Sequence, residues 1–253
     1  MNLRRILAGI IGVGLLGFGA LFLPSFHQPA PSTLAPSDSI GSATSSVSLP
    51  FATNVFAANA ARRTHTQALQ AIAGIPDIDS HKAFGSKTAP VIMEVFSDYQ
   101  CPACKQLFLG TNRQLMENYV TTGKVFLIHR DFPLPGHAHS RVAARYARAA
   151  AQIGKIEPVE EALFQNQEKW EQTGDVDGTV AAALSPAEMA KVRALVKSGT
   201  LEPMIDKDYA LGQVYRVNQT PTTVFHSKGQ TLPYSGVMSY EVLKGFLNQL
   251  LSQ

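Results

Sequence analysis

Two cysteines three positions apart are the residues of this 253-residue sequence best suited to chemistry. Cys101 and Cys104 are its only cysteines, and they follow an apolar segment, Val91–Phe96, that is typical of a buried strand. A structural disulfide stabilises a fold mainly by closing a long loop, and a bond between these two would close almost nothing. The pair is therefore interpreted as a redox-active dithiol rather than a structural crosslink.

A metal site and an inert pair of buried thiols are the alternatives for Cys101 and Cys104. Structural zinc requires four ligands, usually from a second Cys pair or from a His pair at a fixed spacing. The sequence has no second Cys pair, and its one local His pair, His137 and His139, lies well downstream. These histidines are interpreted as surface or helix-start residues. We therefore expect no metal and no organic cofactor.

The N-terminal segment predicts where the chemistry takes place. Arg4 and Arg5 precede an apolar run over residues 6–23, which ends at Pro24. This run is within the length range of a membrane-spanning helix and is long for a signal peptide. We expect residues 1–24 to be an uncleaved membrane anchor, with a cleaved signal as the alternative. In both cases the remainder is exported to a periplasmic or other extracytoplasmic compartment, where disulfides persist.

Composition divides the rest of the chain into a linker and a domain. Residues 25–76 begin with a stretch rich in Pro, Ser, Thr and Ala and almost free of charge, which predicts a flexible tether. Residues 77–253 have a normal length for one domain with a sizeable core. The net charge of +3 is small and the basic residues are scattered, so no nucleic-acid partner is expected.

The order of the predicted elements indicates an α/β fold. Val91–Phe96 and residues 124–130 are predicted strands, joined by a helix that begins at Pro102 and runs to about residue 120. A block of helices follows, and then two strands and a last helix. The later helices are predicted at 137–155, 157–170, 186–199, 201–216 and after Ser239, and the later strands at 222–225 and 231–234. The pattern is a thioredoxin-like core with a helical insertion at about residues 136–216.

Three separated segments resemble the DsbA-type family of thiol–disulfide oxidoreductases. Residues 96–104 (FSDYQCPAC) are similar to the family's active-site segment. Residues 130–134 (RDFPL), followed by His137, are similar to the entry into its helical insertion, and residues 219–222 (QTPT) to the loop that carries its cis-proline. The segments occur in the family's order, and the resemblance covers roughly Phe84 to the C-terminus. It implies a thioredoxin-like fold and dithiol–disulfide exchange with exported proteins.

The resemblance implies different chemical roles for the two cysteines. Cys101 would be the nucleophile, because free N–H groups and the helix dipole at a helix N-terminus favour a thiolate. Cys104, one turn further in, would be the more buried resolving thiol. Pro102 and Ala103 lie between them and are expected to line the substrate-binding surface.

Three further site residues are implied. Pro221 would be a cis-proline lying against the active disulfide, with the backbone of Thr220 pairing with an extended substrate. A strand-entry proline is the alternative for Pro221. Glu94 would lie beneath the active site and assist proton transfer. It is one residue further from the first cysteine than in relatives with Phe-Phe-Cys, and strand alternation leaves open that it faces solvent or a lysine.

We therefore expect a membrane-tethered, extracytoplasmic monomer that introduces disulfide bonds into unfolded or reduced exported proteins. A quinone-linked membrane partner would reoxidise it. A disulfide isomerase or reductase on the same scaffold is the nearest alternative, and Thr220 is also typical of isomerase relatives. The region before Phe84 offers no dimerisation domain, which disfavours an isomerase. A redox-inactive binding module or chaperone is disfavoured by the two intact cysteines, and a metal chaperone by the missing second ligand pair.

Overall fold

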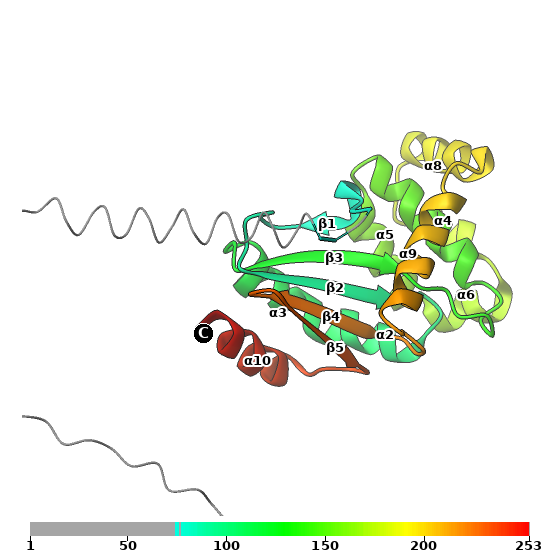
Figure 1. Cartoon of the computed structure of the whole chain (residues 1–253). Coiled ribbons are helices and arrows are strands. Elements are labelled where there is room, and N and C mark those ends of the chain that lie inside the picture. Colours follow the sequence, from blue (N-terminus) through cyan, green and yellow to red (C-terminus); the bar gives the residue numbers. More distant parts are fainter. Residues whose placement is uncertain (1–73, 76, 253) are drawn as a thin grey trace, which may run out of the picture. The chain divides into compact units, whose positions relative to one another are not determined.

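The structure is a computed structural model, and it describes residues 74, 75 and 77–252 (Figure 1). The predicted anchor at residues 1–24 and nearly all of the predicted linker at 25–76 lie outside these residues. Within the described part of the chain, no helix is both long enough and apolar enough to span a membrane.

The described residues form a mixed five-stranded sheet in the order β1-β3-β2-β4-β5. The strands are β1 Ala83–Phe84, β2 Val91–Ser97, β3 Val125–Asp131, β4 Thr222–Ser227 and β5 Gln230–Ser235. β2 and β3 are parallel, and the other pairs are antiparallel. β2 is buried along nearly its whole length, as a continuous apolar run predicts. The two-residue strand β1, preceded by the short helix η1 (Ser80–Lys82), was not predicted.

One long helix, residues 102–120, connects the parallel strands, as predicted. It consists of α2 (Pro102–Leu107), η2 (Phe108–Asn112), α3 (Arg113–Leu115) and η3 (Met116–Val120). η2 and η3 are π-helical turns, a feature often found at functional sites. Gly110 lies in the first of these turns.

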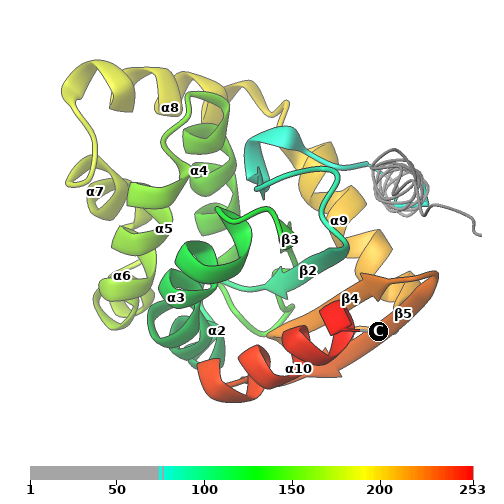
Figure 2. The ribbon, with the colours of Figure 1, turned by 90° about the vertical axis from the view of Figure 1, so that its left-hand side faces the viewer.

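The predicted helical insertion occupies the sequence between β3 and β4. Its helices gather to one side of the sheet, except α9, which packs beside β3 (Figure 2). They are α4 Ser140–Gln152, α5 Ile156–Gln165, α6 Gln167–Thr173, α7 Val176–Ala181, α8 Pro186–Ser198 and α9 Glu202–Val214. A helix was predicted at residues 186–199, and α8 begins there with a capping box of Ser185 and Glu188. The predicted helix 157–170 is instead two helices that break at Asn166, and α7 was not predicted.

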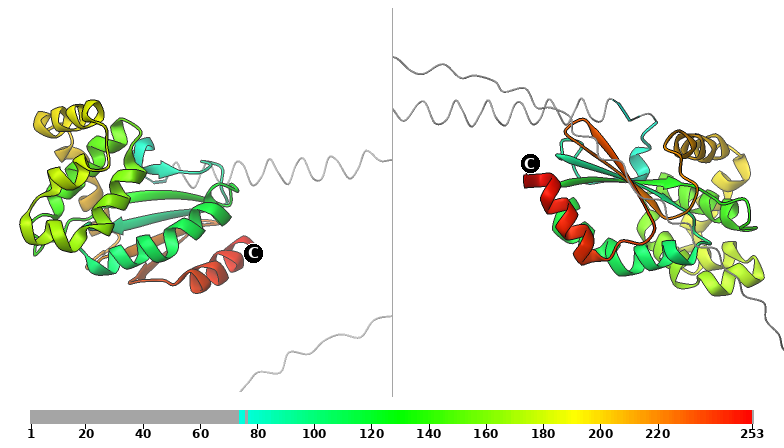
Figure 3. Two further views of the ribbon diagram at one scale, coloured as in Figure 1. Left: turned by 180° about the vertical axis from the view of Figure 1, so that it is seen from behind. Right: turned by 60° about the horizontal axis from the view of Figure 1, so that its bottom comes forward.

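Alternation along β2 divides the core into two faces. Val91, Met93 and Val95 pack against the long helix and against α10 (Tyr240–Ser252), which lie on the same face of the sheet (Figure 3). Phe96 packs on the opposite face with Leu211 of α9. Successive side chains of a strand point to opposite faces, so the position of each residue in β2 decides which helix it meets.

Candidate active site

The two cysteines lie at the start of α2 with unequal exposure. Cys101 is the N-cap residue, and Pro102 occupies the first helical turn, where its missing N–H is not needed. Cys101 is 7% exposed and Cys104 is 1% exposed. Both are free thiols in this structure. An incoming thiol therefore meets Cys101 first, and Cys104 lies behind it.

The surroundings separate the pKa values of the two thiols. The pKa of Cys101 is lowered to about 5, first by a hydrogen bond from the Cys104 thiol and further by Thr220 and the backbone N–H groups of Ala103 and Cys104, against the effect of burial. Burial, followed by the hydrogen bond to Cys101 and the charge of Cys101, raises the pKa of Cys104 well above its ordinary value. At neutral pH, Cys101 is a thiolate and Cys104 keeps its proton.

The loop before β4 lies against Cys101. The Thr220–Pro221 peptide bond is cis, as expected from the resemblance. As a thiol, Cys101 donates a hydrogen bond from Sγ to the carbonyl oxygen of Thr220 at 3.3 Å. The Thr220 hydroxyl is buried without a hydrogen-bond partner among the described residues. It lies close enough to Cys101 to help lower the pKa of this thiol.

Glu94 does not lie in the expected place beneath the active site. It follows the alternation of β2 onto the face that packs against α9, away from the long helix that carries the cysteines. The extra residue between Glu94 and Cys101 accounts for this difference. The side chain faces neither solvent nor a lysine: it is fully buried and accepts hydrogen bonds from Arg130 Nε at 2.7 Å and His226 Nε2 at 2.9 Å. Burial raises the pKa of Glu94, but these two partners outweigh burial and lower it.

Asp98 links the active-site segment to the helical insertion. Its buried carboxylate accepts hydrogen bonds from the backbone N–H groups of Gln100 and Leu134 and from His137 Nδ1, each at 2.8 Å, and another from the Ser140 hydroxyl. Asp98 was part of the recognised motif, but its role was missed. A carboxylate at the end of a buried strand, just before the cysteine pair, was the available signal. His137 is accordingly a structural partner rather than only a surface residue.

Two glutamines complete the link to the insertion. Gln167, at the start of α6, donates from Nε2 to the carbonyl oxygens of Tyr99 at 2.7 Å and Cys101 at 3.1 Å. Gln100 accepts a hydrogen bond from the backbone N–H of His139 at 2.8 Å. His139 is the N-cap residue of α4, so its expected position at a helix start is confirmed. These hydrogen bonds with the insertion therefore hold the backbone of the segment that contains Cys101.

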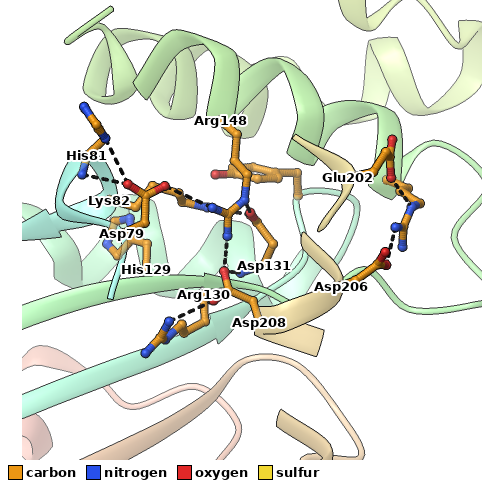
Figure 4. Close-up of polar contacts among 12 residues, drawn as sticks. Asp79, His81, Lys82, His129, Arg130, Asp131, Arg148, Glu202, Asp206 and Asp208 are labelled. Carbon is orange, nitrogen blue, oxygen red and sulfur yellow. Dashed lines mark hydrogen bonds and ion pairs between the residues drawn. The ribbon is translucent and has the colours of Figure 1, made fainter. Parts of the chain in front are cut away.

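A network of buried charges lies at the end of β3 (Figure 4). Asp131 accepts hydrogen bonds from Lys82 Nζ and Arg148 Nε, both at 2.5 Å. Arg148 also reaches Asp208 of α9, which in turn pairs with Arg130. Lys82, Arg130 and Arg148 are almost completely buried, and removing one partner of a buried ion pair is strongly destabilising. The network joins η1, β3, α4 and α9.

The dithiol is the group of this site that can exchange electrons. Its two thiols can give up two electrons and become a disulfide, or accept two electrons in the reverse reaction. Among residues 74, 75 and 77–252, no three His, Cys, Asp or Glu side chains gather as metal ligands would.

Comparisons with known proteins agree with this geometry. A family model described as thioredoxin matches residues 78–247. Disulfide bond formation protein D of Bacillus subtilis (strain 168) is 26% identical over 170 residues, which are 64% of this chain and 75% of that protein.

Two crystal structures are similar in fold. α-DsbA1 from Wolbachia pipientis has a TM-score of 0.60 and 20% sequence identity, with 70% of this chain and 92% of that chain covered. Oxidised BdbD from Bacillus subtilis has a TM-score of 0.56 and 21% identity, with 68% and 93% covered. The α/β fold of the described residues is therefore thioredoxin-like, with a mixed sheet and an added set of helices.

Proposed function

The chain belongs to the thioredoxin family, in its DsbA-type branch, and from that premise we propose that it introduces disulfide bonds into exported proteins. It is a thiol–disulfide oxidoreductase. The observation that carries the proposed direction is the contrast between Cys101, whose pKa is lowered to about 5, and Cys104, whose pKa is raised. A stable thiolate stabilises the reduced enzyme, and a stable reduced form makes the disulfide form a strong oxidant.

The reaction proceeds in two exchanges. A substrate thiolate attacks Cys101 Sγ of the oxidised enzyme, so that a mixed disulfide forms and the Cys101–Cys104 bond breaks. Cys104 leaves with the electron pair and takes up a proton. A second substrate thiolate attacks the substrate sulfur of the mixed disulfide and releases Cys101 as a thiolate. The substrate has then lost two electrons, and the enzyme has gained them.

The loop before β4 provides a surface for an extended substrate. Once Cys101 is deprotonated or bonded to a substrate sulfur, the carbonyl oxygen of Thr220 no longer accepts its proton and is free to accept a substrate N–H. Pro102 and Ala103 flank the sulfur at the helix start. We assign substrate contact to these residues and to Pro221.

A trapping experiment tests the assignment of the cysteines. In Cys104→Ala, the Cys101 thiolate can attack a disulfide of an exported protein and displace one of its thiolates, and no Cys104 is present to release the mixed disulfide, so mixed disulfides should accumulate. Cys101→Ala should trap far fewer, because Cys104 is almost completely buried. Equal trapping by both variants would contradict the assignment.

Isomerisation is the second candidate direction on this scaffold. An assay of reduced, unfolded substrate measures oxidation, and an assay of a scrambled substrate measures isomerisation. We expect a monomer that is efficient in the first assay and weak in the second. A dimer that restores scrambled substrate efficiently would reverse this ranking.

The N-terminal sequence supports the location that we propose. Arg4 and Arg5, followed by the apolar run 6–23, suit an anchor that leaves residues 77–253 outside the cytoplasm. A quinone-linked membrane protein would reoxidise the enzyme there. Full-length protein in the membrane fraction, with the domain open to protease from outside, is the expected result. A shortened soluble form would instead indicate a cleaved signal.

A further inference from the structure

Gln167 is a buried polar residue of the insertion that reaches the backbone of the active-site segment. It is the first residue of α6, and it is 2% exposed. Its Nε2 atom donates hydrogen bonds to the carbonyl oxygens of Tyr99 at 2.7 Å and Cys101 at 3.1 Å. A side-chain amide has two N–H donors, so both donors of Gln167 are used on the segment that contains the nucleophile.

The Cys101 carbonyl belongs to the same residue as the reactive sulfur. Cys101 is the N-cap residue of α2, and its carbonyl oxygen accepts the first hydrogen bond of that helix, from the Lys105 N–H at 3.1 Å. Gln167 is a second donor to this oxygen. A carbonyl oxygen carries a partial negative charge, which disfavours a negative charge on a nearby sulfur. A donor bonded to the oxygen offsets that effect.

Uncharged hydrogen-bond donors stabilise the thiolate of Cys101. The Cys104 thiol lowers the pKa of Cys101 most, followed by Thr220 and the backbone N–H groups of the first helical turn. Inside a protein, where water screens little, such dipoles act more strongly than they would in water. An amide dipole that is bonded to the carbonyl of the same cysteine should therefore add to this stabilisation.

The charged side chains of this region are bonded to other groups. They come from the active-site segment, from α2, from α6 and from the loop before α4. The pairs are Asp98 with His137 at 2.8 Å, Lys105 with Glu168 at 3.2 Å, and Glu171 with the Gln100 amide at 3.2 Å. The insertion thus contacts the Cys101 carbonyl through the uncharged amide of Gln167.

We propose that Gln167 is a positioning residue through which the helical insertion raises the oxidising strength of the dithiol. This inference deepens the proposed function and rests on it. In the reduced enzyme, the Gln167 amide offsets two carbonyl groups near the Cys101 thiolate and so stabilises that thiolate. In the disulfide form, Cys101 carries no charge that the amide could stabilise. Gln167 therefore favours the reduced form, and a more stable reduced form makes the disulfide a stronger oxidant.

Gln167→Met tests the proposal, because it keeps the length of the side chain and removes both hydrogen bonds. Thiolate absorbance against pH measures the acid dissociation constant of Cys101, and a glutathione titration at neutral pH measures the redox equilibrium. We expect the dissociation constant to fall about 3- to 10-fold, the ordinary effect of losing one hydrogen bond. The redox equilibrium should shift toward the disulfide form by a similar factor.

Gln167→Glu provides the same measurement if the buried methionine prevents folding. The carboxyl group has nearly the shape of the amide. In its neutral form it has one O–H donor for two carbonyl oxygens, and in its ionised form its charge repels the thiolate. Both forms should therefore lower the acid dissociation constant of Cys101 and shift the glutathione equilibrium toward the disulfide form.

Gln100→Met is the matched control. Gln100 is also buried and also bonded to the insertion, but its side chain bonds to the His139 N–H and to Glu171. Each substitution removes hydrogen bonds between the active-site segment and the insertion, so each should lower the free energy of unfolding. The dissociation constant of Cys101 and the glutathione equilibrium should stay close to the wild-type values in Gln100→Met.

The outcomes separate this inference from the proposed function. A wild-type dissociation constant and a wild-type redox equilibrium in the Gln167 variants would overturn the inference. Equal shifts in Gln100→Met and Gln167→Met would also overturn it, because a general loosening of the segment would then be the cause. A wild-type protein that cannot oxidise a reduced two-cysteine peptide would instead overturn the proposed function, whatever the Gln167 variants show.

Discussion

The Sγ atom of Cys101 lies 3.3 Å from the carbonyl oxygen of Thr220, a residue 119 positions further along the chain. The contact brings the loop that precedes β4 against the N-terminus of α2. It also places the Thr220 hydroxyl beside the thiol whose pKa is lowered to about 5. One residue thus influences both the charge of Cys101 and the surface on which a substrate would be held.

Thr220→Val should weaken the oxidising power of the enzyme without weakening the fold. The hydroxyl helps to lower the pKa of Cys101, so its loss should raise that pKa and shift the glutathione equilibrium toward the disulfide form. The hydroxyl is buried without a hydrogen-bond partner among the described residues, so the free energy of unfolding should stay within about 1 kcal/mol or increase. Thiolate absorbance against pH and urea unfolding measure the two quantities. Thr223→Val, at a buried threonine of β4, is the control.

Ala103→His should have the opposite effect and strengthen the oxidising power of the enzyme. Ala103 contributes only a backbone N–H to the thiolate, whereas an imidazole can add a charge or a hydrogen bond. The Cys101 pKa should fall further, toward the value of about 3.5 known for a Pro-His pair in DsbA, and the reduction potential should rise with it. Thiolate titration and a glutathione redox titration on both proteins provide the measurement. If neither quantity changes, the residues between the cysteines do not control the potential.

Asp98→Ala should destabilise the protein strongly, because it removes the acceptor of the hydrogen bonds between the active-site segment and the insertion. The donors of these bonds would be left without a partner. We expect a loss of about 3–5 kcal/mol in the free energy of unfolding, measured with urea. Asp98→Asn keeps an acceptor oxygen and the same shape and should lose less. Asp206→Ala, at an exposed aspartate, is the control for loss of charge alone. A loss below about 1 kcal/mol for Asp98→Ala would show that these bonds do not hold the segment in place.

The helices and strands that sequence reasoning located well had strong local signals. Pro102 marks the start of the long helix, and the capping box at Ser185 marks the start of α8. β1 has only two residues and forms by pairing with β3, so it carries no pattern of its own. The break at Asn166 likewise has no proline or glycine to mark it.

The site was predictable where chemistry depends on spacing along the chain. The cysteine pair and the cis-proline loop follow from short motifs. The face on which Glu94 lies depends instead on a one-residue offset in a strand, and one residue moves a side chain to the other side of a sheet. Leu134, His137 and Ser140, the partners of Asp98 outside its own segment, lie 36 to 42 positions away, and only the folded chain brings them to Asp98.

As the pH falls from 7 to 5, the free energy of unfolding of the reduced protein should decrease more than that of the oxidised protein. The pKa of Cys101 is about 5 in the folded protein and about 8.5 in an unfolded chain. A group with a lowered pKa stabilises the fold fully above its unfolded pKa, and this stabilisation disappears as the pH falls to the folded value. The thiolate therefore contributes about 2–3 kcal/mol at pH 7 and little at pH 5.

Urea unfolding of reduced and oxidised protein at pH 5, 6 and 7 isolates this effect. The carboxylates, including Glu94 and Asp131 with lowered pKa values and Asp208 with a raised one, titrate in both forms and largely cancel in the difference. Cys104, whose pKa is raised, keeps its proton throughout this range in the reduced form. The difference in unfolding free energy should change by about 2 kcal/mol between pH 7 and 5, and Cys101→Ala, which has no thiolate at this position, should follow the pH dependence of the oxidised wild type. A difference that does not vary with pH would mean that Cys101 is not a thiolate at neutral pH, and the oxidising direction would lose its physical basis.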